Sequence, residues 1–112
     1  MSKLITCRMK YAQDEEVIAI GTIFMNKASA ILLRSVNGEP IARATINVDH
    51  SHKLHNDEVV IKDYSENEGM YDTLFLAGII VPTNLSINGN RVVRIIDQSI
   101  LDDINTDLAR VA

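Results

Sequence analysis

The sequence has little that serves base stacking, disulfide bonding or membrane insertion. Among its 112 residues are no tryptophan, three tyrosines and two phenylalanines, so aromatic platforms for nucleic-acid bases are scarce. The one cysteine, Cys7, cannot form an internal disulfide, and we expect it to be buried in a strand. The longest apolar run, 74–82, is interrupted by Gly78 and is far shorter than the roughly 20 residues that span a bilayer.

The charge of the chain and its first residues argue against a nucleic-acid-binding protein and against a secreted protein. The formal net charge of −4 argues against direct nucleic-acid binding by neutralisation of phosphates. The first eight residues include Lys3 and Arg8. These charges leave no apolar segment long enough for a secretory signal. With a single cysteine, the sequence favours a protein of the cytoplasm, with no membrane partner.

The length and composition predict one domain over residues 1–112. Hydrophobic residues make up 46% and charged residues 23% of the chain, which is the balance of an ordinary globular protein. Strand-like segments dominate the first half, and two helical segments follow. We therefore expect an α+β fold, with an antiparallel, mostly meander sheet of about five or six strands and two helices at about 66–77 and 98–110.

Alternation of apolar and polar residues indicates strands with one buried face. We expect Ile18, Ile20 and Phe24 to share the buried face of their strand. A helix over Val17–Leu33 is the competing interpretation, disfavoured by Gly21 and the β-branched residues. The expected strands are Lys3–Met9, Glu16–Phe24, Ala28–Ser35, Ile41–Val48, Glu58–Asp63 and Arg91–Ile96, with a short extended piece at Ile79–Pro82 and a turn region at Asn84–Asn90.

The clearest local signal is the pair Asn37-Gly38, which lies between two expected strands. Asn-Gly supplies the positive φ angles that a tight hairpin turn needs. The following segment, Ile41–Val48, alternates cleanly between apolar and polar residues. The sequence therefore predicts a hairpin whose second strand has one face on a core and one in water.

The first helix has both a start and a stop signal. Ser65 and Glu68 match the S-x-x-E capping box, in which each side chain satisfies a free backbone N–H at the start of a helix. Gly69 then lies inside the expected helix at a cost of roughly 1 kcal/mol, unless it permits a close backbone approach. Gly78 fits the left-handed position after the helix, whose expected apolar stripe is Met70, Tyr71, Leu74, Phe75 and Ala77.

The second helix is expected to begin after Asp97, whose carboxylate suits an N-cap. Its apolar residues fall within about a 100° arc at the 3.6-residue period. They are Ile100, Leu101, Ile104, Leu108 and Val111. On that spacing Asp103 and Asp107 lie on the opposite face of the helix, together with Arg110.

Three histidines lie close together in one loop. His50, His52 and His55 follow Asp49 within seven residues, and imidazole and carboxylate are ligand types that zinc or nickel accepts. Lys53 repels a cation, and a solvated loop is the simpler interpretation, so we expect no metal and no cofactor. The alternative function is a small-molecule or metal-binding protein with this loop, or the corner at 64–67, as its pocket.

The acids are unevenly distributed. Residues 57–72 hold six acids against one lysine, and residues 97–112 hold four acids against one arginine, so the rest of the chain is net positive. If both helices lie on one side of the sheet, that side forms an acidic face suited to a basic partner surface. The expected partner-binding residues are Asp63, Glu66, Glu68, Asp72, Leu76, Asp102, Asp103 and Asp107.

The segments 38–48, 57–70 and 76–79 resemble an uncharacterised family of small proteins carried by phages, plasmids and conjugative elements, and the resemblance covers roughly residues 31–81. The match includes Gly38-Glu39-Pro40, the run IKDYSENEGM over 61–70, and Ala77-Gly78-Ile79. The resemblance implies a domain of unknown function from a mobile element and no catalytic residue, and no enzyme motif of phosphate-loop, G-x-S-x-G or H-E-x-x-H type is present. We therefore expect a protein that is not an enzyme.

The expected function combines the acidic face with this resemblance. We expect an accessory protein that binds a host protein or a protein–nucleic-acid complex with a basic surface. A specific version is the inhibition of a host defence nuclease or nucleic-acid-binding complex, of the anti-CRISPR or anti-restriction type, which is an argument by analogy. A homo-dimer is also possible, because the edges of a small sheet need covering.

Overall fold

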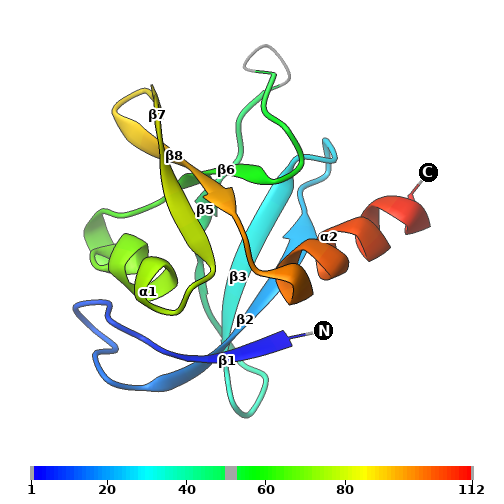
Figure 1. Cartoon of the computed structure of the whole chain (residues 1–112). Coiled ribbons are helices and arrows are strands. Elements are labelled where there is room, and N and C mark those ends of the chain that lie inside the picture. The colour runs from blue at the N-terminus through cyan, green and yellow to red at the C-terminus, as the bar shows by residue number, and fades with distance from the viewer. Residues whose placement is uncertain (1, 50–52, 112) are drawn as a thin grey trace.

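The eight strands of the protein form two antiparallel sheets of four strands each. The computed structural model describes residues 2–49 and 53–111 (Figure 1). The first sheet has the order β1-β2-β3-β4 and the second the order β5-β6-β8-β7. This confirms the α+β class and the antiparallel, mostly meander arrangement. The described residues form eight strands in two sheets, however, and not about five or six strands in one sheet. The strands are β1 (Ser2–Thr6), β2 (Glu16–Ile23), β3 (Ser29–Ser35), β4 (Pro40–Arg43), β5 (Thr45–Ile46), β6 (Glu58–Ile61), β7 (Ile80–Ile87) and β8 (Asn90–Ile95).

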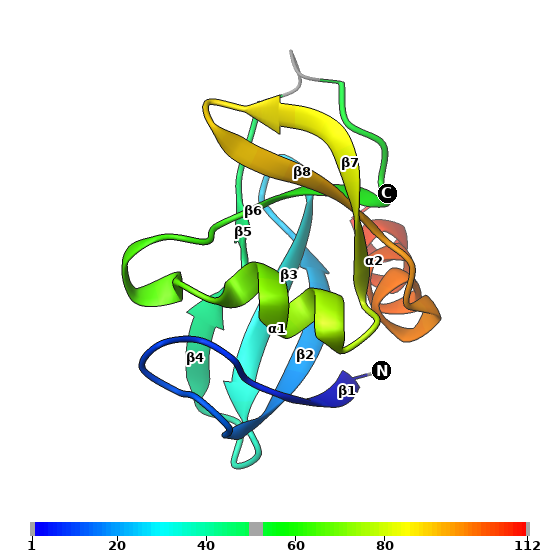
Figure 2. The same ribbon diagram turned by 60° about the vertical axis from the view of Figure 1, so that its left-hand side comes forward.

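The chain passes from the first sheet to the second at Ala44. The sequence predicts one strand over Ile41–Val48, but β4 and β5 are separate and belong to different sheets. The Ala44 N–H donates to the Ile31 carbonyl of β3 (2.9 Å), and the Ala44 carbonyl accepts from the Lys62 N–H (2.9 Å). Buried Ala44 is thus bonded on both sides of the break, and Figure 2 shows β4 and β5 as separate segments.

The hairpin expected at Asn37-Gly38 is confirmed, because β3 and β4 pair on either side of it. Gly38 has φ +89°, which is the left-handed conformation that the turn requires. The region expected as a turn at Asn84–Asn90 is mostly strand, because β7 continues to Ile87 with an irregularity between Pro82 and Ser86. Since β7 lies at the edge of its sheet, the missing N–H of Pro82 is tolerated there.

The face of β2 expected to be buried is the wrong one. Val17, Ala19 and Gly21 are buried, whereas Ile18 and Ile20 point outward and are half-buried. The physical reason is the second helix, which lies against the small residues. A Cβ on Gly21 would lie 2.3 Å from the Ile100 carbonyl oxygen, so only small side chains fit between β2 and this helix.

The second helix, α2 (Gln98–Arg110), has the expected bounds and the expected cap. An Asp97 carboxylate oxygen accepts from the Ile100 N–H at 3.1 Å, and Lys3 Nζ donates to the other at 2.6 Å. The expected placement of the acids opposite the apolar face is wrong. Asp103 is buried and accepts from the Gly21 N–H at 3.1 Å, and Asp107 accepts from the Thr22 hydroxyl at 2.8 Å.

The first helix, α1 (Met70–Leu76), is shorter than the expected 66–77 and follows a separate 3-10 turn, η2 (Ser65–Asn67). The predicted capping box does not form, because Ser65 has φ +53° and begins the 3-10 turn instead. Asp63 caps α1 in its place. One Asp63 carboxylate oxygen accepts from the Gly69 N–H at 2.8 Å and the Met70 N–H at 3.0 Å.

The loop between β1 and β2 holds α1 in position. The Lys10 N–H donates to the Glu68 carbonyl (2.9 Å), and the Arg8 N–H donates to the Thr73 hydroxyl (2.7 Å). Gly69, with φ +99°, has no room for a side chain, because a Cβ there would lie 2.3 Å from the Arg8 carbonyl oxygen. Figure 2 shows this loop running beside α1.

The core lies between the two sheets and is closed by both helices. Met70 and Leu74 of α1, and Ile100 and Ile104 of α2, are fully or almost fully buried in it. Within the residues that the structure describes, no helix is long and apolar enough to cross a membrane. The largest fully buried side chains of the strands and loops are Ile31, Leu33, Ile61, Ile79, Ile80, Ile95, Val17 and Val59.

Candidate protein-binding surface

Four of the five aromatic residues of the chain gather around α1. Tyr11 is 73% exposed, Tyr64 47% and Phe75 43%, and Tyr71 is half-buried. They come from the loop after β1, from the segment before η2 and from α1 itself. We define the α1 surface as these four residues together with Glu66, Glu68, Asp72 and Leu76.

The rings on α1 are held in a fixed arrangement. Tyr71 and Phe75 lie one helical turn apart, and their rings stack with centroids 5.6 Å apart and an interplanar angle of 10°. The Arg91 guanidinium of β8 lies 4.4 Å from the Tyr71 ring centroid, within the range of a cation–π interaction. A hollow of about 250 Å³ lies beside them, between Tyr64, Tyr71 and Arg91. The α1 surface therefore offers ordered rings with a recess next to them.

The acids of the α1 surface differ in whether they form ion pairs with other residues of the chain. Lys62 donates to Glu66 at 2.8 Å, and this hydrogen bond lowers the pKa of Glu66 and raises the pKa of Lys62. Glu68 lies 3.9 Å from the Lys10 ammonium. Exposed Asp72 forms no ion pair with any residue in 2–49 or 53–111. At least one carboxylate is thus available to a cationic group of another molecule.

The single acidic face expected from the sequence does not form. Figure 1 places α1 and α2 on opposite sides of the molecule. Asp102 is exposed and accepts from the Gln98 amide at 2.9 Å, while Asp103 and Asp107 bond β2 as described above. The structure brings together Asp63, Glu66, Glu68, Asp72 and Leu76, and it leaves the α2 acids apart from them.

Leu76 is 61% exposed, as a residue that contacts a partner should be. It does not form an exposed apolar patch with the nearby Ile79 and Ile80. Ile79 and Ile80 are buried in the core. A hollow of about 250 Å³ between α1 and β1 instead places Leu76 beside Leu4, which is 57% exposed. The apolar part of the α1 surface therefore continues toward β1.

Sequence reasoning missed the aromatic residues of this surface. Tyr71 and Phe75 match the helical spacing of a buried stripe, in which Met70 and Leu74 are fully buried and Tyr71 and Ala77 pack partly buried against the core. Phe75 is 43% exposed. The four-residue spacing of two rings is a signal that could have indicated an aromatic pair. The approach of Tyr11 depends on the loop after β1 and has no local signal.

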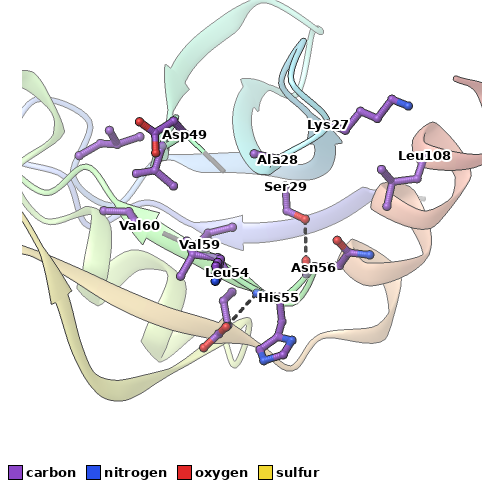
Figure 3. Close-up of a pocket in the computed structure, with 14 residues that line it drawn as sticks. Lys27, Ala28, Ser29, Asp49, Leu54, His55, Asn56, Val59, Val60 and Leu108 are labelled. Carbon is purple, nitrogen blue, oxygen red and sulfur yellow. Dashed lines mark hydrogen bonds between the residues drawn. The ribbon is translucent and has the colours of Figure 1, made fainter. Parts of the chain in front are cut away.

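The histidine loop borders a separate pocket of about 250 Å³ (Figure 3). His50 and His52 lie outside the described residues. The backbone N–H of His55 donates to the Glu58 carboxylate at 2.9 Å, and the Ser29 hydroxyl donates to the Asn56 carbonyl at 2.6 Å. Among the described residues, no three His, Cys, Asp or Glu side chains are grouped to hold a metal ion. Polar groups at this pocket thus bond one another.

The geometry defines a two-sheet α+β protein with an exposed surface of stacked rings and acids. No family model, curated protein or solved structure matches the chain. The resemblance to proteins of mobile elements accordingly remains a prediction from the sequence.

Proposed function

We propose that the protein is a non-enzymatic binding protein whose α1 surface docks on a partner protein. The observation that carries the proposal is the concentration of four of the five aromatic residues beside three acids. Protein interfaces are enriched in aromatic residues and arginine, and tyrosine and arginine are common among the residues that dominate binding energy. Stacked Tyr71 and Phe75 also lose little conformational freedom on binding, since α1 and Arg91 already hold them.

The charge of the α1 surface favours a basic partner. Asp72 and Glu68 would attract lysine and arginine side chains during the encounter, and such residues also line proteins that hold nucleic acid. In the cytoplasm of a bacterial host, this chemistry suits a protein that blocks a defence nuclease or nucleic-acid-binding complex. The resemblance to mobile-element proteins supports that setting.

The test is retention of one partner by variants of the full chain. Wild-type protein immobilised on a resin is expected to retain a protein with a basic surface from a bacterial lysate, identified by mass spectrometry. The retained protein is then purified and titrated against the variants. Replacing Glu66, Glu68 and Asp72 together by Lys should abolish binding, because the basic partner then meets like charge.

The matched control is Asp102→Lys, which changes one exposed acid on the opposite side of the molecule and should leave affinity unchanged. The double change of Tyr71 and Phe75 to Ala should weaken binding roughly tenfold or more. Unchanged affinity in both α1 variants, with circular dichroism spectra like that of the wild type, would refute the proposal.

A further inference from the structure

The outer face of the first sheet carries a second apolar patch, which meets the α1 surface at Leu4. In the strand register, Leu4 lies beside Ile18, and Ile20 lies beside Leu32. Residues directly opposite each other in neighbouring strands point to the same face of a sheet. Leu4 is 57% exposed, and the other three residues are half-buried. We call Leu4, Ile18, Ile20 and Leu32 the outer patch.

The residues of β2 are distributed in an unusual way between its two faces. The inner face has the small residues Ala19 and Gly21, while the outer face has Ile18 and Ile20. Packing of α2 explains the small inner residues, as the close approach at Gly21 shows. It does not explain large aliphatic side chains on the outer face, which add nothing to the buried core. A contiguous apolar patch of this kind marks an interaction surface.

The charged residues around the outer patch complement one another across a two-fold axis. Arg34 lies beside Ile18 in the register, Arg43 beside Leu32, and Glu16 beside Thr6. On the sheet itself the basic residues therefore lie over β3 and β4 and the acid over β2, while Asp107 and Arg110 of α2 border the patch beside Ile20. Arg34 forms no ion pair within the described part of the chain, so it is available to a carboxylate from outside.

We propose that the outer patch binds the outer patch of a second copy of this chain. Sheets that stack face to face lie about 10 Å apart with their strands nearly aligned. A two-fold axis parallel to the strands, between β2 and β3, stacks Ile20 of one copy on Leu32 of the second. It also sets Glu16 one register step from Arg34 of the second copy, and this pair occurs twice in the dimer.

The alternative two-fold axis, perpendicular to the strands, is less favourable. It would keep β3 above β3 and β4 above β4, so that the arginines of both copies gather on one side of the interface. Like charges in close contact oppose association. Two shallow hollows flank the patch, of about 400 Å³ beside Ile41 and Arg43 and about 330 Å³ beside Ile20 and Arg34. They give the protruding side chains of a second copy room to enter.

Sedimentation velocity of the full chain over a range of concentrations tests the proposal. We expect a reversible dimer with twice the mass of the chain. Ile20→Lys should raise the dimer dissociation constant roughly tenfold or more, the effect of a central interface residue. The matched control is Leu85→Lys, which adds the same charge at a 57% exposed position on β7 of the other sheet and should leave the dissociation constant unchanged.

A charge exchange tests the orientation of the two copies. Arg34→Glu alone should weaken the dimer, because it puts an acid one register step from Glu16 of the second copy, and Glu16→Arg together with Arg34→Glu should restore it. If Ile20→Lys does not fold, Ile20→Thr keeps the β-branched shape and removes apolar contact. A monomer at every concentration, or a dimer equally strong in the Ile20 variant, would overturn the proposal. Neither result bears on partner binding by the α1 surface.

Discussion

At the scale of single residues, the sequence predicts one role for Gly69 and the structure gives it another. The sequence predicts that Gly69 lies inside a helix and destabilises that helix. In the structure it lies just before α1 with φ +99°, in contact with the backbone of Arg8. The sequence reveals that a glycine is present and that a close approach is possible, but the approaching segment is about sixty residues away and carries no local signal. The conformation and the contact together require glycine here.

A comparison of Gly69 with Gly38 separates the requirement for a positive φ from the requirement for space beside the Arg8 backbone. Both have positive φ, +99° and +89°, but a Cβ on Gly38 would have no atom within 4 Å. Gly38→Ala should therefore cost only the left-handed conformation, about 1 kcal/mol. Gly69→Ala should cost at least about 2 kcal/mol, since the Arg8 backbone must also move. Urea denaturation of both variants measures the difference, and equal losses would contradict the role of the contact.

At the scale of elements, the sequence predicts what is local and misses what is distant. The N-cap at Asp97 and the bounds of α2 follow from residues within one turn and are confirmed. The buried face of β2 is wrong, because both faces of this strand are apolar and alternation alone does not say which one meets α2. The ion pair between Lys3 and Asp97 joins residues 94 positions apart and has no local signature.

The N-cap of α2, Asp97, makes the stability of the fold depend on pH. Burial raises the pKa of the Asp97 carboxyl, but hydrogen bonds from Lys3, Ser99 and the Ile100 N–H outweigh burial and lower its pKa below the ordinary value of 3.8. A carboxyl with a lowered pKa stabilises the fold above its unfolded-state pKa, and this stability is lost as the pH falls through the folded-state pKa.

Asp97→Ala should therefore lower the free energy of unfolding by about 1–2 kcal/mol at pH 7. The gap between wild type and variant should close as the pH falls below about 3.8, the ordinary Asp pKa. Asp97→Asn, which can still cap the helix but carries no charge for Lys3, should lose less. Thermal melts at several pH values measure the gap, and a gap that widens toward low pH would show the sign to be wrong.

At the scale of the whole molecule, the α+β class could be predicted from the sequence, but the division into two sheets could not. The break at Ala44 depends on hydrogen bonds to Ile31 of β3 in the first sheet and to Lys62, which directly follows β6 of the second sheet. The candidate site was predicted in part. Acids at 63–72 and Leu76 lie together, whereas Tyr11 and Arg91 reach the same surface only through the fold.

The stability of the whole molecule should not depend on a metal ion. A millimolar chelator is expected to leave the melting temperature unchanged, because Lys53 repels a cation from the neighbouring histidines. Differential scanning fluorimetry with and without the chelator, and with added zinc or nickel, measures this. A melting temperature that falls with chelator and recovers with zinc would favour the alternative of a metal-binding protein.

The contacts between α2 and the first sheet also set an order of events during synthesis. Gly21 and Thr22 of β2 bond Asp103 and Asp107, which are more than eighty residues later in the chain. While a ribosome makes the chain from its amino end, the inner face of β2 therefore lacks its contacts with α2 until the residues of α2 have emerged. Contacts between such distant positions slow folding, and an apolar strand without its partner is exposed to aggregation. During synthesis β2 thus depends on α2 for protection.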